Sequence, residues 1–195
     1  MSLKYSSTTA DYLSWEQNLS LVRKLQNDGQ VRMSLLISIG SFWGIRISDI
    51  LNLKWNQIIS ENTLEITEKK TGKKRSIKIN QQLHQHIVEC YTQIKPAKDD
   101  EFVFISQKNS VYSVQQVNRL FKTIKTKYKL KIKNFSTHSM RKTFGRQVFS
   151  QSGDNAELAL VKLSQLFNHS STLITRRYLG ISQEELMNTY DMLSF

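Results

Sequence analysis

Three residue pairs with capping-box spacing mark where helices begin along this chain. They are Ser14 and Gln17, Ser113 and Gln116, and Ser182 and Glu185. In a capping box the first side chain accepts a hydrogen bond from the backbone N–H three residues on, and the later side chain reciprocates. Helices are predicted over about 15–27, 31–42, 47–53, 81–93, 114–126, 156–167 and 171–178, after an N-cap at Thr137, and after Ser182. The pattern predicts a mainly α-helical fold.

One hairpin interrupts the helices. Apolar residues alternate with polar ones at two places, Leu64 with Ile66 and Ile77 with Ile79. Between them lies E-K-K-T-G-K-K-R, in which Thr71-Gly72 forms the turn. A third short strand is predicted over 102–105. The fold class is therefore α+β, mainly α-helical, with a small antiparallel β-sheet.

The charge balance indicates a polyanionic partner. The 195 residues suit one domain and include 28 Lys+Arg against 16 Asp+Glu, a formal net charge of +12. Nucleic acid is favoured over a membrane, because no apolar run approaches the ~18 residues of a membrane span. Residues 1–10 are mostly polar, so we expect no signal peptide. Cys90 is the single cysteine, which fits a reducing cytosol. We expect a cytoplasmic, nucleoid-associated protein.

Two groups of cations are candidates for contact with DNA phosphates. One lies on the hairpin, and the other runs from Lys122 to Lys133 without an intervening acid. The candidate DNA-binding residues are Lys69, Lys73, Lys74, Arg75, Lys122, Lys125, Lys127 and Lys129. The alternative for both groups is a solvated charged surface with no ligand.

Arg46 is unusual among the remaining cations. It lies between two branched apolar residues in G-I-R-I-S-D. One interpretation is an arginine whose aliphatic stem covers the core. The other is a functional guanidinium that Asp49, three residues on, orients by a charge-assisted hydrogen bond.

Four polar residues stand out in the helical C-terminal third. His138 and Arg141 share a helix face at i, i+3 in T-H-S-M-R. His169 follows a helix that is predicted to bury Leu158, Leu160, Val161, Leu163 and Leu166. Tyr178 comes nine residues after His169. This set suits phosphoryl transfer without metal. Singly, each has a structural explanation, such as a helix C-cap for His169. His84 and His86, two apart on their helix, are expected at the surface.

Together these segments resemble the tyrosine recombinases, the phage integrase family. G-I-R-I-S-D-I-L-N-L resembles the first-arginine box and E-K-K-T-G-K the catalytic-lysine hairpin. T-H-S-M-R-K-T-F resembles the His-x-x-Arg box, and F-N-H-S-S-T-L-I-T-R-R-Y the second-histidine box with its nucleophile. Asn168 stands where many relatives have Gly. The resemblance runs from about Leu13 to Leu193 and implies the catalytic residues Arg46, Lys70, His138, Arg141, His169 and Tyr178.

The resemblance implies site-specific DNA recombination through a 3′-phosphotyrosyl intermediate. Tyr178 would attack a phosphodiester with His138 as general base, and Lys70 would protonate the leaving 5′-oxygen. Arg46, Arg141 and His169 would hold the phosphate oxygens. No metal and no cofactor is expected, because the arginines supply the positive charge.

The resemblance also implies partners. These are double-stranded DNA and other protomers in a tetrameric synapse on DNA, where the apolar C-terminal tail from Ile181 to Phe195 would dock on a neighbour; docking on its own core is the alternative. The chain has no room for the family's N-terminal DNA-clamping domain, so we expect a single catalytic domain over 1–195. The need for accessory DNA-bending proteins stays open. Two functional alternatives are DNA relaxation by a type IB topoisomerase and a non-cutting DNA-binding regulator.

Overall fold

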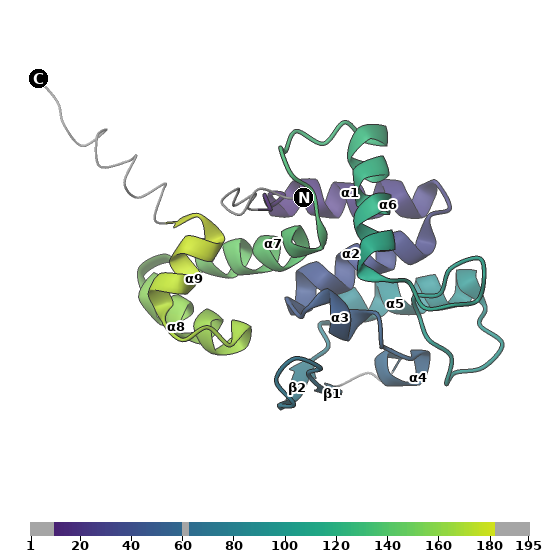
Figure 1. Cartoon of the computed structure of the whole chain (residues 1–195), viewed down its shortest axis with the longest axis horizontal. Coiled ribbons are helices and arrows are strands. Elements are labelled where there is room, and N and C mark those ends of the chain that lie inside the picture. The colour runs from purple at the N-terminus through teal and green to yellow at the C-terminus, as the bar shows by residue number, and fades with distance from the viewer. Residues whose placement is uncertain (1–9, 60–62, 182–195) are drawn as a thin grey trace, which may run out of the picture. The chain divides into compact units, whose positions relative to one another are not determined.

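A computed structural model describes residues 10–59 and 63–181 (Figure 1). The chain divides into two compact units between Thr143 and Phe144, and each is described by itself. The helix predicted after Ser182, with its proposed docking, lies outside the described residues. The single-domain assignment stays a prediction.

The first unit is mainly helical. Its elements are α1 (Trp15–Asn27), α2 (Val31–Trp43), α3 (Ile47–Ile50), α4 (Trp55–Ile58), β1 (Thr63–Thr67), β2 (Lys74–Lys78), α5 (Gln81–Ile94) and α6 (Val114–Lys127). The helix α7 (Thr137–Ser150) begins in this unit and ends in the second, which also holds η1 (Gly153–Asn155), α8 (Ala156–Phe167) and α9 (Thr172–Leu179). The predicted fold class is confirmed.

Local cap chemistry sets the helix starts. Ser14 and Gln17 form the predicted capping box: the Gln17 N–H donates to Ser14 Oγ at 3.2 Å, and the Ser14 N–H donates to Gln17 Oε1 at 3.1 Å. The second box begins α6 in the same way. Two predictions on short segments were less accurate. The helix expected to Leu53 ends at Ile50, and α7 already includes Thr137, which was expected to be its cap.

The centre of the first unit is α2. Ten of its residues are buried, on every side of the helix, and it packs against α1 and α5. A helix that is apolar all round must be covered by other elements. The side chain of Met140, on α7, approaches Gly40 so closely that a Cβ there would lie 2.5 Å from its sulfur. This packing seats the first turn of α7, which carries His138 and Arg141, against the core.

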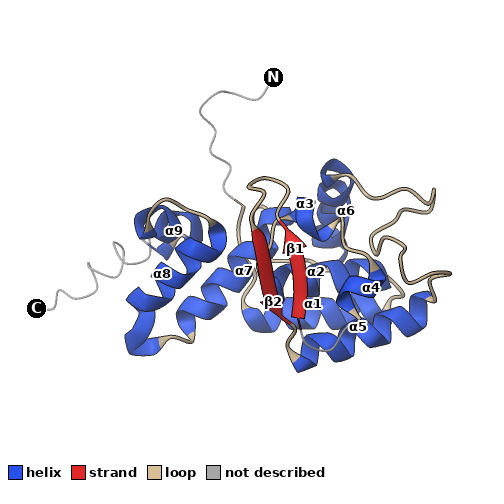
Figure 2. Ribbon diagram, turned by 90° about the horizontal axis from the view of Figure 1, so that it is seen from below, coloured by secondary structure: helices blue, strands red, loops and turns tan. Residues whose placement is uncertain are grey.

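The predicted hairpin is present. Figure 2 shows β1 and β2 side by side as a two-stranded ribbon. The strands are antiparallel, with Leu64 opposite Ile77 and Ile66 opposite Arg75. Leu64 and Ile77 are buried and fix which face meets the core. The third strand predicted over 102–105 is wrong. Phe102 forms an isolated bridge to Lys54, and Ile105 forms another to Val111, so no continuous strand pairing develops. The centre of the segment is nevertheless fully buried.

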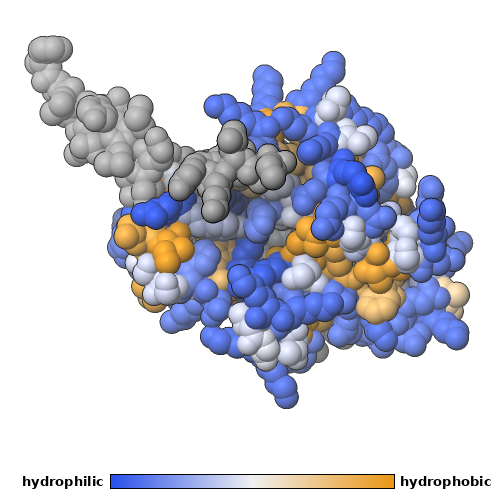
Figure 3. Space-filling model, in the orientation of Figure 1, coloured by the Kyte–Doolittle hydropathy of each residue, from blue (hydrophilic) through white to orange (hydrophobic). Residues whose placement is uncertain are grey.

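The second unit has its own small core. Its buried apolar residues are Leu160, Leu163, Phe167, Leu179 and Ile181. Two residues of α8 predicted to be buried are exposed, Leu158 at 51% and Val161 at 42%. They lie outside the helix stripe that meets α9. Figure 3 shows apolar residues of this kind at the surface among a hydrophilic majority. Among the described helices, none is long and apolar enough to cross a membrane.

Candidate active site

Gly44 connects the segments that carry two arginines from distant boxes. Gly44 ends α2 in the left-handed conformation, with φ of 57°, and turns the chain so that Arg46 caps the start of α3. The Arg141 side chain is 6% exposed, and its Nη1 donates to the carbonyl oxygen of Gly44 at 2.5 Å. Arg141 is therefore fixed beside the backbone that carries Arg46.

His138 lies nearly one helical turn before Arg141 on α7. Its side chain is exposed at the surface, yet the chain around it partly desolvates the imidazole. This desolvation lowers the pKa of His138, and the positive charges of Arg141 and Lys142 lower it further. This shift favours the neutral imidazole, the form that can accept a proton.

The hairpin turn is built around a buried carboxylate. The Glu68 N–H donates to the carbonyl of Lys73 at 3.0 Å, and the Gly72 N–H donates to the carbonyl of Glu68 at 2.8 Å. Lys70 lies within this turn and is exposed. Arg46 Nη1 donates to Glu68 Oε2 at 2.7 Å, whereas Asp49 Oδ1 accepts from the Lys69 N–H at 3.0 Å. Glu68 is thus an acid that contacts Arg46, whereas Asp49, which was expected to orient Arg46, binds the backbone of the hairpin turn.

Glu68 also contacts one of the predicted DNA-binding residues. Arg75 Nη1 lies 3.5 Å from Glu68 Oε1, and Arg75 is half-buried. Burial lowers the pKa of Arg75, and the carboxylate opposes that shift. The other three hairpin candidates, Lys69, Lys73 and Lys74, are exposed.

The lysine run on α6 and the following segment is anchored in its middle and at its C-terminal end. Lys127 Nζ lies 2.7 Å from Asp28 Oδ2, and Lys125 Nζ donates to the carbonyl of Lys133 at 2.6 Å. The backbone N–H of Lys133 donates to Asp11 Oδ2 at 2.8 Å. Lys122 is exposed. The predicted phosphate-binding lysines thus sit on a segment that is held against the unit.

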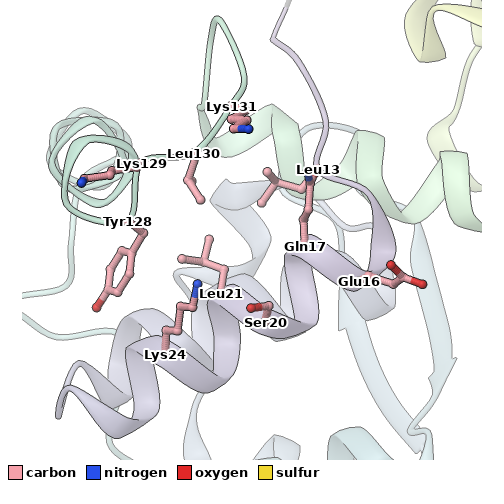
Figure 4. Close-up of a pocket in the computed structure, with 10 residues that line it drawn as sticks. All are labelled: Leu13, Glu16, Gln17, Ser20, Leu21, Lys24, Tyr128, Lys129, Leu130 and Lys131. Atoms are coloured by element: carbon pink, nitrogen blue, oxygen red, sulfur yellow. The ribbon is translucent and has the colours of Figure 1, made fainter.

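A groove of about 350 Å³ lies between α1 and residues 128–131. Figure 4 shows Leu21 and Leu130 facing one another across it. Lys24, Lys129 and Lys131 line it together with Glu16. Lys129, a predicted DNA-binding residue, therefore borders a groove with apolar walls and a basic rim.

The second unit brings His169 and Tyr178 together. Asn168 ends α8 in the left-handed conformation, with φ of 53°, a position where glycine is common. The rings of His169 and Tyr178 lie edge to face with centroids 5.3 Å apart, and Phe167 packs against both. His169 Nδ1 lies 2.9 Å from the hydroxyl of Thr175, which is fully buried.

The tautomer of His169 depends on where the proton of the Thr175 hydroxyl lies. Its hydroxyl also lies 3.4 Å from the carbonyl of Ser171, a longer contact than the one to the ring. If the hydroxyl proton goes to Nδ1 across the shorter contact, Nε2 carries the imidazole proton and can donate to a ligand.

The remaining histidines are structural. His84 Nε2 lies 2.9 Å from the carbonyl of Ile59, and His86 Nε2 lies 3.2 Å from Ser34 Oγ. Both are half-buried, so the surface expectation was wrong. Burial raises the pKa of Cys90 to about 12, which leaves the thiol unreactive. No group of three or more His, Cys, Asp or Glu side chains suited to a metal occurs in the described part of the chain.

Sequence reasoning missed Glu68 and Thr175. Glu68 is the acid that begins an otherwise cationic hairpin tip, and that isolation was a usable signal. Thr175 follows Ser171 by four residues on α9, and no local pattern distinguishes it from an ordinary helical threonine.

The chain matches the model of the Phage integrase family over residues 12–185. It is 37% identical over 147 residues to "Probable integrase/recombinase YoeC" of Bacillus subtilis (strain 168), which covers 75% of this chain and 76% of that protein. It is 23% identical to tyrosine recombinase XerH of Campylobacter jejuni over 90% of this chain and 50% of that one. The chain thus spans about half the length of the XerH relative.

Solved structures agree in fold. The XerA recombinase superimposes with a TM-score of 0.71 at 20% identity, over 96% of this chain and 67% of that one. The post-cleavage complex of XerH with a palindromic difH substrate gives a TM-score of 0.69 at 20% identity, over 94% of this chain and 53% of that one. The family and the catalytic-domain fold predicted from the sequence are confirmed.

Proposed function

The chain belongs to the phage integrase family of tyrosine recombinases, and on this premise we propose how it cuts and rejoins DNA. Tyr178 attacks a phosphodiester, so that recombination proceeds through a 3′-phosphotyrosyl intermediate. The observation that carries this proposal is the contact between Arg141 and the carbonyl of Gly44, which sets two guanidinium-bearing boxes side by side.

Paired arginines suit a phosphate in the transition state. A guanidinium offers forked N–H donors that match phosphate oxygens, and it keeps its charge at any physiological pH. Because Arg141 is buried and bonded to backbone, its position is set before any substrate binds. Arg46 and Arg141 would hold the two non-bridging oxygens, with His169 Nε2 as a further donor.

The proton transfers fall to His138 and Lys70. A free tyrosine has a pKa of about 10 and is a poor nucleophile at neutral pH. Neutral His138 would take the Tyr178 proton as the phenolic oxygen bonds to phosphorus. The bond from phosphorus to the 5′-oxygen breaks at the same time, and Lys70 would give that oxygen a proton. The reverse reaction with a new 5′-hydroxyl rejoins a strand without ATP.

Relatives support the proposed partners. The XerH structure contains difH substrate, the Tn1549 transposon integrase was solved with transposon right end DNA, and a lambda integrase dimer was solved on a COC′ core site. For this chain we propose double-stranded DNA and further protomers assembled on it, which would place its work at the nucleoid. The net charge of +12 supports a DNA substrate.

A trapped covalent adduct tests the proposal. A binding site is first selected from random duplex DNA at low salt, and nicks are then placed along it so that the released 5′-hydroxyl fragment diffuses away. We expect the wild-type protein to form an adduct that survives denaturation, and Tyr178→Phe to bind the DNA without forming it. Tyr190→Phe is the matched control and should behave like wild type. An adduct formed by Tyr178→Phe would reject the assignment.

The same DNA separates the functional alternatives. A recombinase should exchange strands between paired selected sites, whereas a type IB topoisomerase should relax supercoiled DNA that lacks those sites. A non-cutting regulator should form no adduct on any nicked substrate. The family match and the recombinase relatives favour strand exchange.

A further inference from the structure

Glu68 connects two groups to which the proposed mechanism assigns different tasks. Its side chain is 6% exposed, although it directly follows β1 at the start of a cationic turn. Oε2 accepts two hydrogen bonds, from Arg46 Nη1 at 2.7 Å and from Thr71 Oγ1 at 2.8 Å. Arg75 approaches the other oxygen. One carboxylate oxygen therefore bridges the first-arginine box and the residue next to Lys70.

The electrostatics show that this is an ionised, organised contact. Burial alone would raise the pKa of Glu68, but hydrogen bonds from Thr71 and Arg46 and the charges of Arg46 and Arg75 lower it overall. A buried carboxylate is tolerated only when such partners satisfy it, and removal of one partner leaves the others unbalanced. The contact is thus unlike an exposed surface ion pair, which contributes little.

The backbone reinforces the same connection. The turn closes on Glu68 through its N–H and its carbonyl, which bond to Lys73 and Gly72. The Lys69 N–H bonds to Asp49, a buried residue three positions after Arg46. The turn that carries Lys70 is consequently tied to the 46–49 segment through both a side chain and the main chain.

We propose that Glu68 is a positioning residue that couples the phosphate-binding Arg46 to the turn carrying Lys70. This inference rests on the function proposed above. Glu68 touches no reacting atom. It fixes the position of the Arg46 guanidinium, which binds the attacked phosphate, relative to that of Lys70, which protonates the leaving oxygen. A displacement of either residue is therefore transmitted to the other.

The coupling can be resolved with two substrates. In the first, the scissile phosphate keeps its 5′-oxygen, and in the second a sulfur replaces it. A thiolate leaves without protonation, since a thiol has a pKa of about 8.5. The sulfur substrate therefore removes the need for Lys70 but keeps the need for Arg46. Single-turnover adduct formation is measured for Glu68→Ala, Glu68→Gln and Thr71→Val, with Glu65→Gln as the control because Glu65 is an exposed glutamate of β1.

We expect Glu68→Ala and Thr71→Val to cleave the oxygen substrate at least about tenfold more slowly, within the range that proton transfer contributes. Thr71→Val should recover to within about threefold of wild type on the sulfur substrate, because only the lysine side of the contact is broken. Glu68→Ala should recover only in part, since Arg46 is also displaced. Glu68→Gln keeps a hydrogen-bond acceptor for Thr71 but loses the charge that holds Arg46. Its cleavage rate should therefore recover less on the sulfur substrate than that of Thr71→Val. Equal defects of Thr71→Val on both substrates, or wild-type rates for Glu68→Ala, would overturn the proposal.

A second measurement needs no cleavage. Amide hydrogen exchange reports the hydrogen-bonded N–H groups of Glu68, Lys69 and Gly72 in the protein without DNA. Arg46→Ala, a change on another element, should speed exchange in this turn about tenfold, while Glu65→Gln should not. Unchanged exchange in Arg46→Ala would overturn the coupling even if the protein forms no adduct. If the wild-type protein forms the adduct and the Glu68 variants form it at the same rate, this inference is rejected and the proposed function stands.

Discussion

Arg141 Nη1 donates to the carbonyl oxygen of Gly44 at 2.5 Å, which joins α7 to the turn that carries Arg46. The two residues are 97 positions apart in the sequence. Gly44 has a φ of 57°, which gives its carbonyl oxygen the direction that Arg141 requires. A residue restricted to negative φ would direct this carbonyl elsewhere. The geometry of the arginine pair therefore depends on one left-handed residue.

Gly44→Ala should damage cleavage more than stability. The left-handed conformation costs a non-glycine residue roughly 1–2 kcal/mol. Gly29, with φ of 72° and open space around it, is the matched control. Urea unfolding should show a similar decrease in the free energy of unfolding for both alanine variants. The single-turnover cleavage rate should fall at least about tenfold only for Gly44→Ala. Equal cleavage by the two variants would separate the Gly44 turn from the site.

Cleavage should persist in EDTA. Arg46 and Arg141 would neutralise the charge that a metal ion neutralises in other phosphoryl-transfer enzymes. Adduct yield is compared with and without EDTA, and a magnesium-dependent nuclease in the same buffer serves as the positive control for chelation. Activity that disappears in EDTA and returns with Mg²⁺ would reject the arginine-based mechanism.

The acid limb of the pH–rate profile should belong to His138. A general base works only when it is deprotonated, so the rate falls as pH drops through its pKa. Since partial burial and neighbouring cations lower that pKa from 6.5, the midpoint of the limb should lie below pH 6.5. His138→Gln should be slower by about 100-fold and lack the limb. DNA binding is measured over the same range, and a limb that survives in His138→Gln would assign it to another group.

Salt dependence should distinguish two lysines of the same helix. Each phosphate contact contributes about −0.9 to the slope of log affinity against log salt. Lys122→Gln should make the slope shallower by about one unit. Lys127→Gln should change it less, because Lys127 must first leave Asp28, 2.7 Å away. Lys108→Gln, an exposed lysine outside the predicted set, is the control, and equal slopes for Lys122→Gln and Lys108→Gln would exclude Lys122 from the interface.

Thr175→Val should act through His169. Valine keeps the buried shape but offers Nδ1 no hydrogen-bond partner, so the tautomer and the orientation of the His169 ring are no longer held. We expect cleavage to fall about tenfold, a loss in the range of a misplaced hydrogen bond to the phosphate. The double variant with His169→Ala should be no slower than His169→Ala alone. Additive losses would show that Thr175 affects the rate by another route.

Local chemistry made much of the fold predictable. The two predicted capping boxes that lie within the described residues, at the starts of α1 and α6, depend on residues within a few positions of one another. The hairpin and its Thr71-Gly72 turn follow from alternation and turn composition in the same way. The order of the four boxes then identified the family, because each box is a contiguous string.

Contacts between distant elements could not be predicted in this way. Asp49 was the nearest acid to Arg46 in sequence, yet Glu68, 22 residues away, is its partner because the hairpin packs against α3's start. Leu158 and Val161 are as apolar as their buried neighbours and face outward, because α9 covers only one side of α8. The sequence by itself determined the helices, the hairpin and the family, through hydrogen bonds and periodicity that are local. The tertiary structure decided which charges pair and which backbone carbonyl Arg141 binds, because those choices arise only when separate elements come together.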